Sequence, residues 1–574
     1  MSEKRALILW ILCGALGLLF AQRYFFRAFP EASIDFKVSQ NEAETRAKKF
    51  LADLGENVND YKSSVVFEVD DNAKTYLERE LGLQQANRVM SSEVDVWYWE
   101  VRFFRPLQIE EYEVRISPAG KVVAFEHKIE EARGAKSLSR AEALASAEQF
   151  LRSNEGLDLD QWNFLPEEAG SEVKPNRLDW SFSWEKKGFK AKDAPYRLEV
   201  GLEGDRIGGA RASLKVPEDW KRGYAHLRST NDFYELVAFI PYGFLLGGAL
   251  WLGVNLSRRG ETRWMPAVKI GGVVAVLFLL MQLNEWNTLQ PNYATHDSYS
   301  SFLAQRFFLA LLQALGTGLM VTLVLPGGEP LYRSTQPDKL RLSNAFSLRG
   351  LRSKEFFCSS LVGLGLAAAH IGFIVAFYMI GSKHGVWAPQ DTNYSGAFNT
   401  AIPWIGGVAI GVTAATSEEF LFRLFAIPFL HKMTGSRVLA VILPAFFWGF
   451  LHSNYPQEPG YIRGLEVGLI GIVAGLVMLR WGILATLIWH YTVDASLVGL
   501  LLIRSDNLYY RISGVVVGLA AVAPLLWSGV SYLLRGRFEP VDDLLNGAAA
   551  APKIEFSPKP PEAAPAARDR KSVV

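Results

Sequence analysis

Residues 417–423 read Ser-Glu-Glu-Phe-Leu-Phe-Arg, and this stretch decides how the rest of the chain is interpreted. It lies inside an apolar run, residues 402–430, so two carboxylates and a guanidinium occur where hydrocarbon is expected. An ionisable residue at the centre of a bilayer costs about 2.5 to 3.5 kcal/mol on insertion scales and by default marks a functional site. The Glu418-Glu419 pair is therefore the first candidate for chemistry.

Two later apolar stretches also carry polar side chains. His452 ends the second stretch, and His490 and Asp494 lie four residues apart in the third. Residues four apart share one face of a helix, so we expect the last two side chains to point the same way. Three predicted membrane segments thus each supply a group able to bind a water molecule or a metal ion.

The composition indicates a polytopic α-helical membrane protein with a soluble insert. Of the 574 residues 49% are hydrophobic, and they concentrate after residue 236, whereas residues 31–230 have an ordinary soluble composition. The net charge of +1 gives no reason to expect nucleic acid as a partner. Both cysteines, Cys13 and Cys358, fall in apolar segments, so the insert has no disulfide framework.

Ten membrane spans are predicted. The first apolar run, residues 6–21, follows a short basic stretch, as in a signal peptide, but no clear small-x-small cleavage site follows Ala21, which favours an uncleaved signal anchor. Lys and Arg in the short loops place both termini in the cytoplasm and residues 31–230 outside it. The expected spans cover residues 6–21, 236–256, 267–283, 302–325, 356–380, 399–424, 438–453, 464–479, 482–503 and 512–534.

The soluble insert contains one pattern twice. Each copy opens with Ser-x-x-Glu before a helical run, at Ser39 to Glu42 and at Ser139 to Glu142, and continues into alternating strands joined by Gly-containing turns. Two similar α+β modules are therefore expected in tandem. Their order resembles the PepSY-type modules that flank some proteases, which implies a regulatory or substrate-binding ectodomain. The alternative is a spacer.

The two adjacent glutamates cannot share one role, because neighbouring helical residues point about 100° apart. Glu419 and Arg423 are spaced for an intrahelical ion pair, which leaves Glu418 free to act as a general base on water. His452 could hold that water or bind a metal, and Asp494 could fix the tautomer of His490 or join it as a ligand. A purely structural polar cluster between helices is the alternative.

The three motifs together resemble those of the CPBP family, the CAAX prenyl proteases and bacteriocin-processing proteins, also called Abi proteins. Glu-Glu-x-x-x-Arg, aromatic-x-x-x-His and His-x-x-x-Asp/Asn occur here in the right order, and the resemblance covers residues 356–534. It implies an intramembrane endopeptidase of the glutamate type. By position it implies that Glu418 activates water, Glu419 and Arg423 support it, His452 shares the water, and His490 with Asp494 stabilises the oxyanion.

The sequence departs from the family pattern at three positions. Trp448 replaces the usual Phe, Leu424 stands where Gly is common, and Asp494 replaces the Asn of the prenyl proteases. An ionised Asp accepts hydrogen bonds but cannot donate them, so Asp494 would orient His490, carry a proton or bind a metal. No cofactor is certain. The donor types of Glu418, His452, His490 and Asp494 would suit zinc, and the metal question stays open.

We therefore predict a bacterial, multi-pass cell-membrane endopeptidase that acts on a membrane-embedded or membrane-associated peptide and has the lipid bilayer as its surroundings. A prenylated substrate is not expected. The alternatives are a proton- or ion-coupled transporter, in which intramembrane Glu, His and Asp carry protons, and an inactive immunity or scaffold member of the family. His370, without a polar neighbour at helical spacing, is predicted to be a packed histidine. The expected divisions are a signal anchor (1–30), an extracytoplasmic tandem α+β domain (31–230), additional transmembrane helices with a basic cytoplasmic loop (231–355), a CPBP protease core (356–536) and a disordered cytoplasmic tail (537–574).

Overall fold

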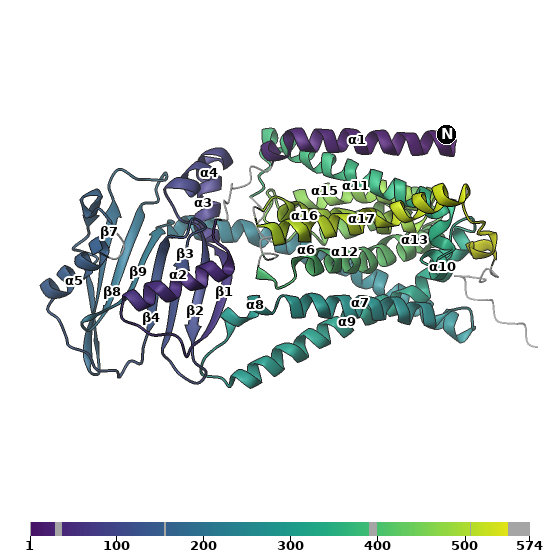
Figure 1. Cartoon of the computed structure of the whole chain (residues 1–574). Coiled ribbons are helices and arrows are strands. Elements are labelled where there is room, and N and C mark those ends of the chain that lie inside the picture. Colours follow the sequence, from purple (N-terminus) through teal and green to yellow (C-terminus); the bar gives the residue numbers. More distant parts are fainter. Residues whose placement is uncertain are drawn as a thin grey trace, which may run out of the picture.

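The chain forms a β-sheet domain at one end and a helical bundle at the other (Figure 1). The computed structural model describes residues 2–28, 37–153, 157–389, 396, 399–505 and 507–548. The long helix α6, Glu218–Arg258, starts at the sheet domain and continues into the bundle. Its 41 residues span about 60 Å, enough to cross a bilayer and extend well beyond it.

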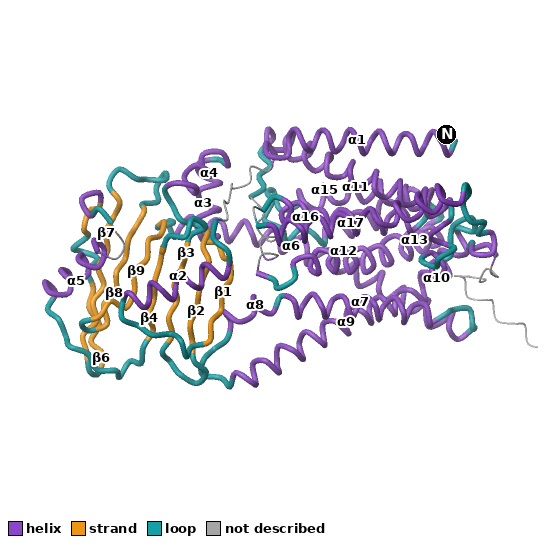
Figure 2. Tube along the Cα trace, in the orientation of Figure 1, coloured by secondary structure: helices purple, strands orange, loops and turns teal. Residues whose placement is uncertain are grey.

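The sheet domain is built on one nine-stranded sheet with strand order β1-β2-β3-β4-β9-β8-β7-β5, and β6 also pairs with β7 (Figure 2). Every pairing is antiparallel. Helix α2 packs on β1–β3, and α5 packs on β7–β9. The strands are β1 Lys62–Val69, β2 Trp97–Phe104, β3 Glu111–Ile116, β4 Val122–Lys128, β5 Trp162–Phe164, β6 Gly170–Lys174, β7 Arg177–Lys186, β8 Tyr196–Glu203 and β9 Arg206–Leu214; the helices are α2 Gln40–Asp53, α3 Asp71–Leu81, α4 Leu83–Ser92 and α5 Arg140–Ser153.

The internal repeat is visible in matching local contacts. Ser39 and Glu42 form a capping box at the start of α2, and Ser139 and Glu142 make the same set of hydrogen bonds before α5. In each module a strand tryptophan donates its indole N–H to the carbonyl just before that serine, Trp99 to Val38 and Trp180 to Leu138. The last strands of the two modules, β4 and β9, pair and join them into one sheet.

The modules differ at one place. Helices α3 and α4 lie between the first and second strands of the first module, β1 and β2. The short strand β6 occupies the corresponding place in the second module, between β5 and β7. The first module therefore carries a helical insert where the second carries a hairpin strand.

The described residues contain nine helices that are long and apolar enough to cross a membrane, so the chain is a multi-pass membrane protein. Close helix packing relies on small residues: an added Cβ at Gly17 in α1 would lie 2.6 Å from the Ala368 carbonyl oxygen in α11. The membrane helices are α1 Glu3–Ala28, α6, α7 Trp264–Asn284, α9 Tyr299–Thr335, α11 Lys354–Gly381, α12 Pro403–Glu419 continuing through α13 Ala426–Thr434, α15 Ile462–Trp481, α16 Ile483–Ile503 and α17 Leu508–Arg535.

The predicted span 438–453, which is not among the nine long helices, is shorter than expected. It forms α14, Arg437–Phe450, whose 14 residues extend only about 21 Å, against about 30 Å for the hydrocarbon core. The helix ends before His452, and residues 451–461 continue as turns that lead to α15. The short helix therefore brings His452 to the depth of Glu418, which straight, full-length spans would not do.

The region after α17 corrects the predicted disordered tail of residues 537–574 for its first part. Asn546 N donates to the Lys339 carbonyl at 2.8 Å, and Arg349 pairs with Asp543 at 2.9 Å. These hydrogen bonds hold residues 541–548 against the loop after α9. Val541 is also buried in the bundle core, and Leu544 and Leu545 pack against it. The sequence did not reveal this order because these contacts join parts of the chain that are far apart in sequence. Residues 549–574 lie outside the described part of the chain.

Candidate active site

The glutamate pair lies at the end of α12, where the helix changes its geometry. Residues Phe420–Phe425 are π-helical before the chain continues as α13. A π-helical turn shifts the direction of the side chains that follow it, and such turns occur frequently at functional sites. Arg423 falls inside this turn and is 2% exposed. The π-helical turn thus buries a guanidinium next to the two glutamates.

Glycines bring α14 close enough to α15 to fix the second motif. An added Cβ at Gly449 would lie 2.5 Å from the Gly464 carbonyl oxygen and 2.6 Å from the Gly468 nitrogen. The spacing of Gly464, Gly468, Gly471 and Gly475 follows the small-residue pattern of close helix pairs. This close packing leaves little freedom to Trp448, which lies against Gly471.

Close helix packing at a glycine also brings the third motif to the glutamates. An added Cβ at Gly411 of α12 would lie 2.7 Å from the ring of Tyr491 in α16, so these two helices are in direct contact. His490 and Asp494 lie one turn apart on α16 and both point toward the end of α12. The three motifs therefore meet at one place in the bundle.

Glu418 is the centre of this cluster. Its Oε2 lies 3.6 Å from His490 Nε2 and 3.9 Å from His452 Nε2, and it accepts a hydrogen bond from the Trp448 indole N–H. His452 Nδ1 lies 3.0 Å from the Trp448 carbonyl oxygen. A carbonyl can only accept, so Nδ1 carries the proton and a neutral His452 directs the lone pair of Nε2 at Glu418. The side chain of Glu418 is 27% exposed.

Glu419 joins two other residues of the cluster. Its Oε1 lies 2.9 Å from Arg423 Nη1 and 2.8 Å from His490 Nδ1. Since the carboxylate accepts the Nδ1–H, it leaves His490 Nε2 directed at Glu418. The Arg423 guanidinium also lies over the Trp448 ring, 4.0 Å from its centroid. Glu419 is 0% exposed and Arg423 2%, so this pair is sealed from solvent.

The structure differs from the sequence prediction in what orients His490. Asp494 Oδ2 lies 3.5 Å from His490 Nε2, too far for a good hydrogen bond, and Glu419 holds the other ring nitrogen. Spacing along one helix favoured Asp494, whereas the stronger contact comes from a different helix. Asp494 is 26% exposed and lies on the accessible side of the cluster with Glu418.

Sequence reasoning missed a second buried cluster in the bundle. Glu466 of α15 is 0% exposed, pairs with Arg463 and lies 3.8 Å from His370 Nε2. The prediction that His370 is packed holds for its burial, yet a carboxylate on another helix faces it. An acidic residue inside an apolar span was the available signal, the same one that singled out Glu418.

The arrangement of possible metal ligands bears on the zinc prediction. Within the described ranges no group of three His, Cys, Asp or Glu converges so as to hold an ion. The Glu418 oxygen that faces both imidazoles is also the acceptor for the Trp448 indole. Zinc dependence stays a prediction for experiment.

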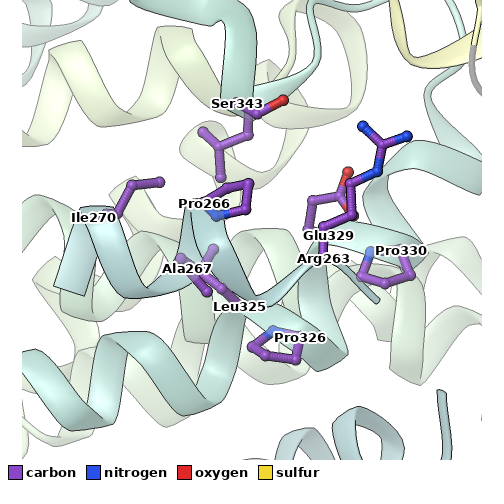
Figure 3. A pocket seen from close by; sticks show the side chains of 10 residues that line it. Arg263, Pro266, Ala267, Ile270, Leu325, Pro326, Glu329, Pro330 and Ser343 are labelled. Atoms are coloured by element: carbon purple, nitrogen blue, oxygen red, sulfur yellow. The ribbon is translucent and has the colours of Figure 1, made fainter. Parts of the chain in front are cut away.

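Two pockets lie away from the cluster. One, between α7, α9 and the short helix α10, Leu342–Ala345, holds about 20 Å³, room for about one water molecule (Figure 3). The other holds about 310 Å³ and has Lys339, Lys354 and Arg480 in its wall. Neither is lined by a residue of the three motifs.

Fold and site together define a multi-pass membrane protein with carboxylates and imidazoles gathered inside its bundle. Residues 400–496 match the model of the family described as type II CAAX prenyl endopeptidase Rce1-like. These residues contain all three motifs. The match confirms the expected resemblance: residues 400–496 are similar to the Rce1-like family of CAAX prenyl endopeptidases.

A relative covers nearly the whole chain. The sporulation-killing factor biosynthesis protein SkfC of Bacillus subtilis (strain 168) is 18% identical over 496 residues, which are 86% of this chain and 95% of that protein. The similarity therefore extends beyond residues 400–496. No solved structure matches the chain.

Proposed function

We propose that the protein is an intramembrane endopeptidase that hydrolyses a peptide bond with Glu418 as general base. The observation that carries this proposal is the position of one partly exposed carboxylate within 3.6 and 3.9 Å of two imidazole nitrogens inside a membrane bundle. A water oxygen about 2.8 Å from both Glu418 Oε2 and His452 Nε2 fits between acceptors at this separation.

The reaction follows from the direction of each group. Glu418 takes a proton from the water held with His452, and the hydroxide attacks the scissile carbonyl carbon. His490 donates from Nε2 to the oxyanion that forms on the carbonyl oxygen. The C–N bond then breaks, and the proton on Glu418 passes to the leaving amine. The products are a carboxylic acid and an amine, with one water consumed.

The remaining cluster residues act on the three that touch substrate. Glu419 holds His490 through Nδ1, and Arg423 balances the charge of Glu419 in a site without solvent. Asp494 lies on the accessible side near His490 Nε2, where it can keep that nitrogen protonated for donation. The proposed type is a glutamate endopeptidase; in the metal-dependent alternative the same four residues, Glu418, His452, His490 and Asp494, would hold zinc.

The proposed substrate is a membrane-embedded or membrane-associated peptide. The name of the relative, a biosynthesis protein of a sporulation-killing factor, favours a peptide that is processed during biosynthesis over a prenylated protein. We also propose that the sheet domain, with its two modules of PepSY-like order, lies outside the cytoplasm and that both chain termini lie inside it, as Lys and Arg in the loops indicate.

A proton relay is the second candidate. The buried Glu466 and His370, with the partly exposed Arg463, support it, because they continue the line of polar groups beyond the first cluster. The ring of Trp489 interrupts this line, 5.7 Å from the His370 ring and adjacent in sequence to His490. A relay predicts proton flux in liposomes that is lost in Glu466→Gln, whereas a protease predicts cleaved products.

The deciding experiment compares released peptides and the membrane proteome of cells that carry the wild-type protein, Glu418→Ala or Glu418→Gln at equal expression. Products found only with the wild type would support the proposal and identify the substrate. A parallel sample treated with a chelator tests zinc, since metal dependence would remove the products. Identical profiles from folded variants would overturn the protease and favour the relay or an inactive scaffold.

A further inference from the structure

The sheet domain contacts the loop that follows His452. Arg79 on α3 pairs with Glu458 in this loop, and its guanidinium lies 5.4 Å from the centroid of the Trp387 ring. Trp387 and Glu458 exchange both backbone hydrogen bonds, at 2.9 and 2.8 Å. Arg79 of the sheet domain thus contacts both Trp387 and Glu458, at the point where these two segments of the membrane bundle pair.

Helix α6 fixes the same loop at two further points. Arg228 Nη2 donates to the Asn454 carbonyl at 2.6 Å, and Asn231 Nδ2 donates to the Gln457 carbonyl at 2.8 Å. Asn231 is 0% exposed. The loop is therefore held at three of its residues, and the first of them is two residues from His452.

The chain that leads into α12 is attached to the neighbouring part of the sheet. The Asn399 side chain accepts from Phe67 N at 2.7 Å and donates to Phe67 O at 3.2 Å, so it pairs with the edge of β1 like a strand residue. Phe67 stands four residues before α3. Residues 67–79 therefore contact both the segment that enters the Glu418 helix and the loop that leaves His452.

The element that makes the contact with Glu458 belongs to one module only. Helix α3 is part of the insert of the first module, and β6 stands at the matching place in the second module. The repeat predicts a strand hairpin at this place, so the insert is a departure from the shared pattern. This insert is the part of the first module that contacts the loop after His452.

We propose that α3 sets the position of His452 over Glu418 through the pair of Arg79 and Glu458, so that the sheet domain controls hydrolysis. The inference rests on the proposed endopeptidase function. A water molecule can bridge the two groups across the gap of 3.9 Å, and a displacement of about 1 Å at a catalytic group can cost about 100-fold in rate. Arg79 and Glu458 are positioning residues, since they act through His452.

The kinetic test uses the full-length protein and the substrate peptide that the comparison of released peptides identifies. Arg79→Ala is expected to lower kcat roughly 10- to 100-fold with KM unchanged. The charge swap Arg79→Glu with Glu458→Arg is expected to restore most of the rate, because it restores the ion pair. Equal kcat in the wild type and Arg79→Ala would overturn the proposal.

Arg102→Ala is the matched control. Arg102 also joins the sheet domain to the bundle, through hydrogen bonds of 2.9 and 2.8 Å to the carbonyls of Pro291 and Tyr293, but that loop leads to no residue of the cluster. We expect its kcat to stay within about twofold of the wild type, as for a site outside the chemistry. A loss equal to that of Arg79→Ala would mean that any loosening of the sheet domain slows the enzyme, and would overturn the specific role of α3.

A second measurement does not depend on catalysis. In a chain with Cys13 and Cys358 replaced by serine, Glu418→Cys and His452→Cys are linked with a short bis-methanethiosulfonate reagent. The linked fraction is expected to fall several-fold when Arg79→Ala is added and to stay unchanged with Arg102→Ala. An unchanged fraction in both would overturn the inference. A fall with Arg79→Ala, together with no cleavage by the wild-type protein in the comparison of released peptides, would retain the inference while rejecting the proposed function.

Discussion

The bundle contains two buried clusters of Glu, His and Arg that differ in one respect. In the first, Glu418 and Asp494 are 27% and 26% exposed, so two carboxylates can be reached from outside. In the second, Glu466 is 0% exposed and His370 8%. Both clusters combine Glu, His and Arg, and their carboxylates differ in accessibility. Exposure rather than composition therefore separates a candidate for chemistry from a structural polar contact.

The first cluster also contains a sealed part. Glu419 and Arg423 are nearly as buried as Glu466; Glu419 contacts His490, and Arg423 contacts Glu419. The motif Glu-Glu-x-x-x-Arg thus combines one exposed and one sealed carboxylate at adjacent positions. The comparison predicts that the exposed groups control the rate, whereas the sealed groups control stability and geometry.

The largest expected effect is that of Glu418→Gln. The amide keeps the acceptor for the Trp448 indole but cannot take a proton from water, so we expect the cleavage rate to fall roughly 10²- to 10⁴-fold. The thermal unfolding midpoint should stay close to that of the wild type. The measurement is the rate of product formation per folded molecule. A loss below tenfold would contradict the prediction that the exposed groups control the rate, because the exposed carboxylate would then not be the base.

Glu466→Gln should show the opposite behaviour. It removes the negative charge beside the Arg463 guanidinium and should destabilise the fold by about 2 to 3 kcal/mol, somewhat below the range for a completely buried pair because Arg463 is 21% exposed. Unfolding of the purified protein in detergent micelles measures this, with Glu218→Gln, at an exposed carboxylate, as the control. The rate per folded molecule should not change. If it fell as far as in Glu418→Gln, the second cluster would take part in the function and the relay would be favoured.

Arg423→Lys tests the sealed part of the first cluster. Lysine keeps the charge that Glu419 needs but loses the planar group that stacks on Trp448, so a destabilisation of about 1 to 2 kcal/mol is expected. A small drop in rate should follow from a less fixed His490. The same unfolding measurement, combined with the rate, separates the two effects. A full loss of activity without loss of stability would place Arg423 in the chemistry.

The smallest effect is expected for His370→Leu. Neither ring nitrogen of His370 makes a hydrogen bond, so an apolar side chain of similar size should change stability by no more than about 1 kcal/mol. The matched variant His490→Leu deprives Glu419 of its hydrogen bond and should abolish cleavage. Equal behaviour of the two variants in the cleavage assay would remove the distinction between the clusters.

Much of the architecture could be predicted from the sequence. Apolar runs of about 20 residues located the long spans because the bilayer fixes their length. The capping boxes at Ser39 and Ser139 located the two modules because their hydrogen bonds are local. The three motifs met as expected. Glu418 lies within 4 Å of both His452 and His490.

What could not be predicted depends on contacts between distant parts of the chain. The π-helical turn at Phe420–Phe425 has no local signal, and it decides where Arg423 points. The hydrogen bond from His490 to Glu419 crosses between helices, so helical spacing pointed to Asp494 instead. Glu466 had a signal, but no motif drew attention to it. Interhelical geometry is the information that one sequence lacks.

The length of α14 has a consequence for the lipid around the protein. A helix of about 21 Å matches a bilayer roughly a third thinner than the average hydrocarbon core, and its outward residues Val438 and Leu439 are exposed. Hydrophobic mismatch then draws the headgroups inward along this side of the bundle. Short-chain lipids relieve that strain and long-chain lipids increase it. The length of the acyl chains therefore changes the depth of His452 in the bilayer with no change in the protein sequence.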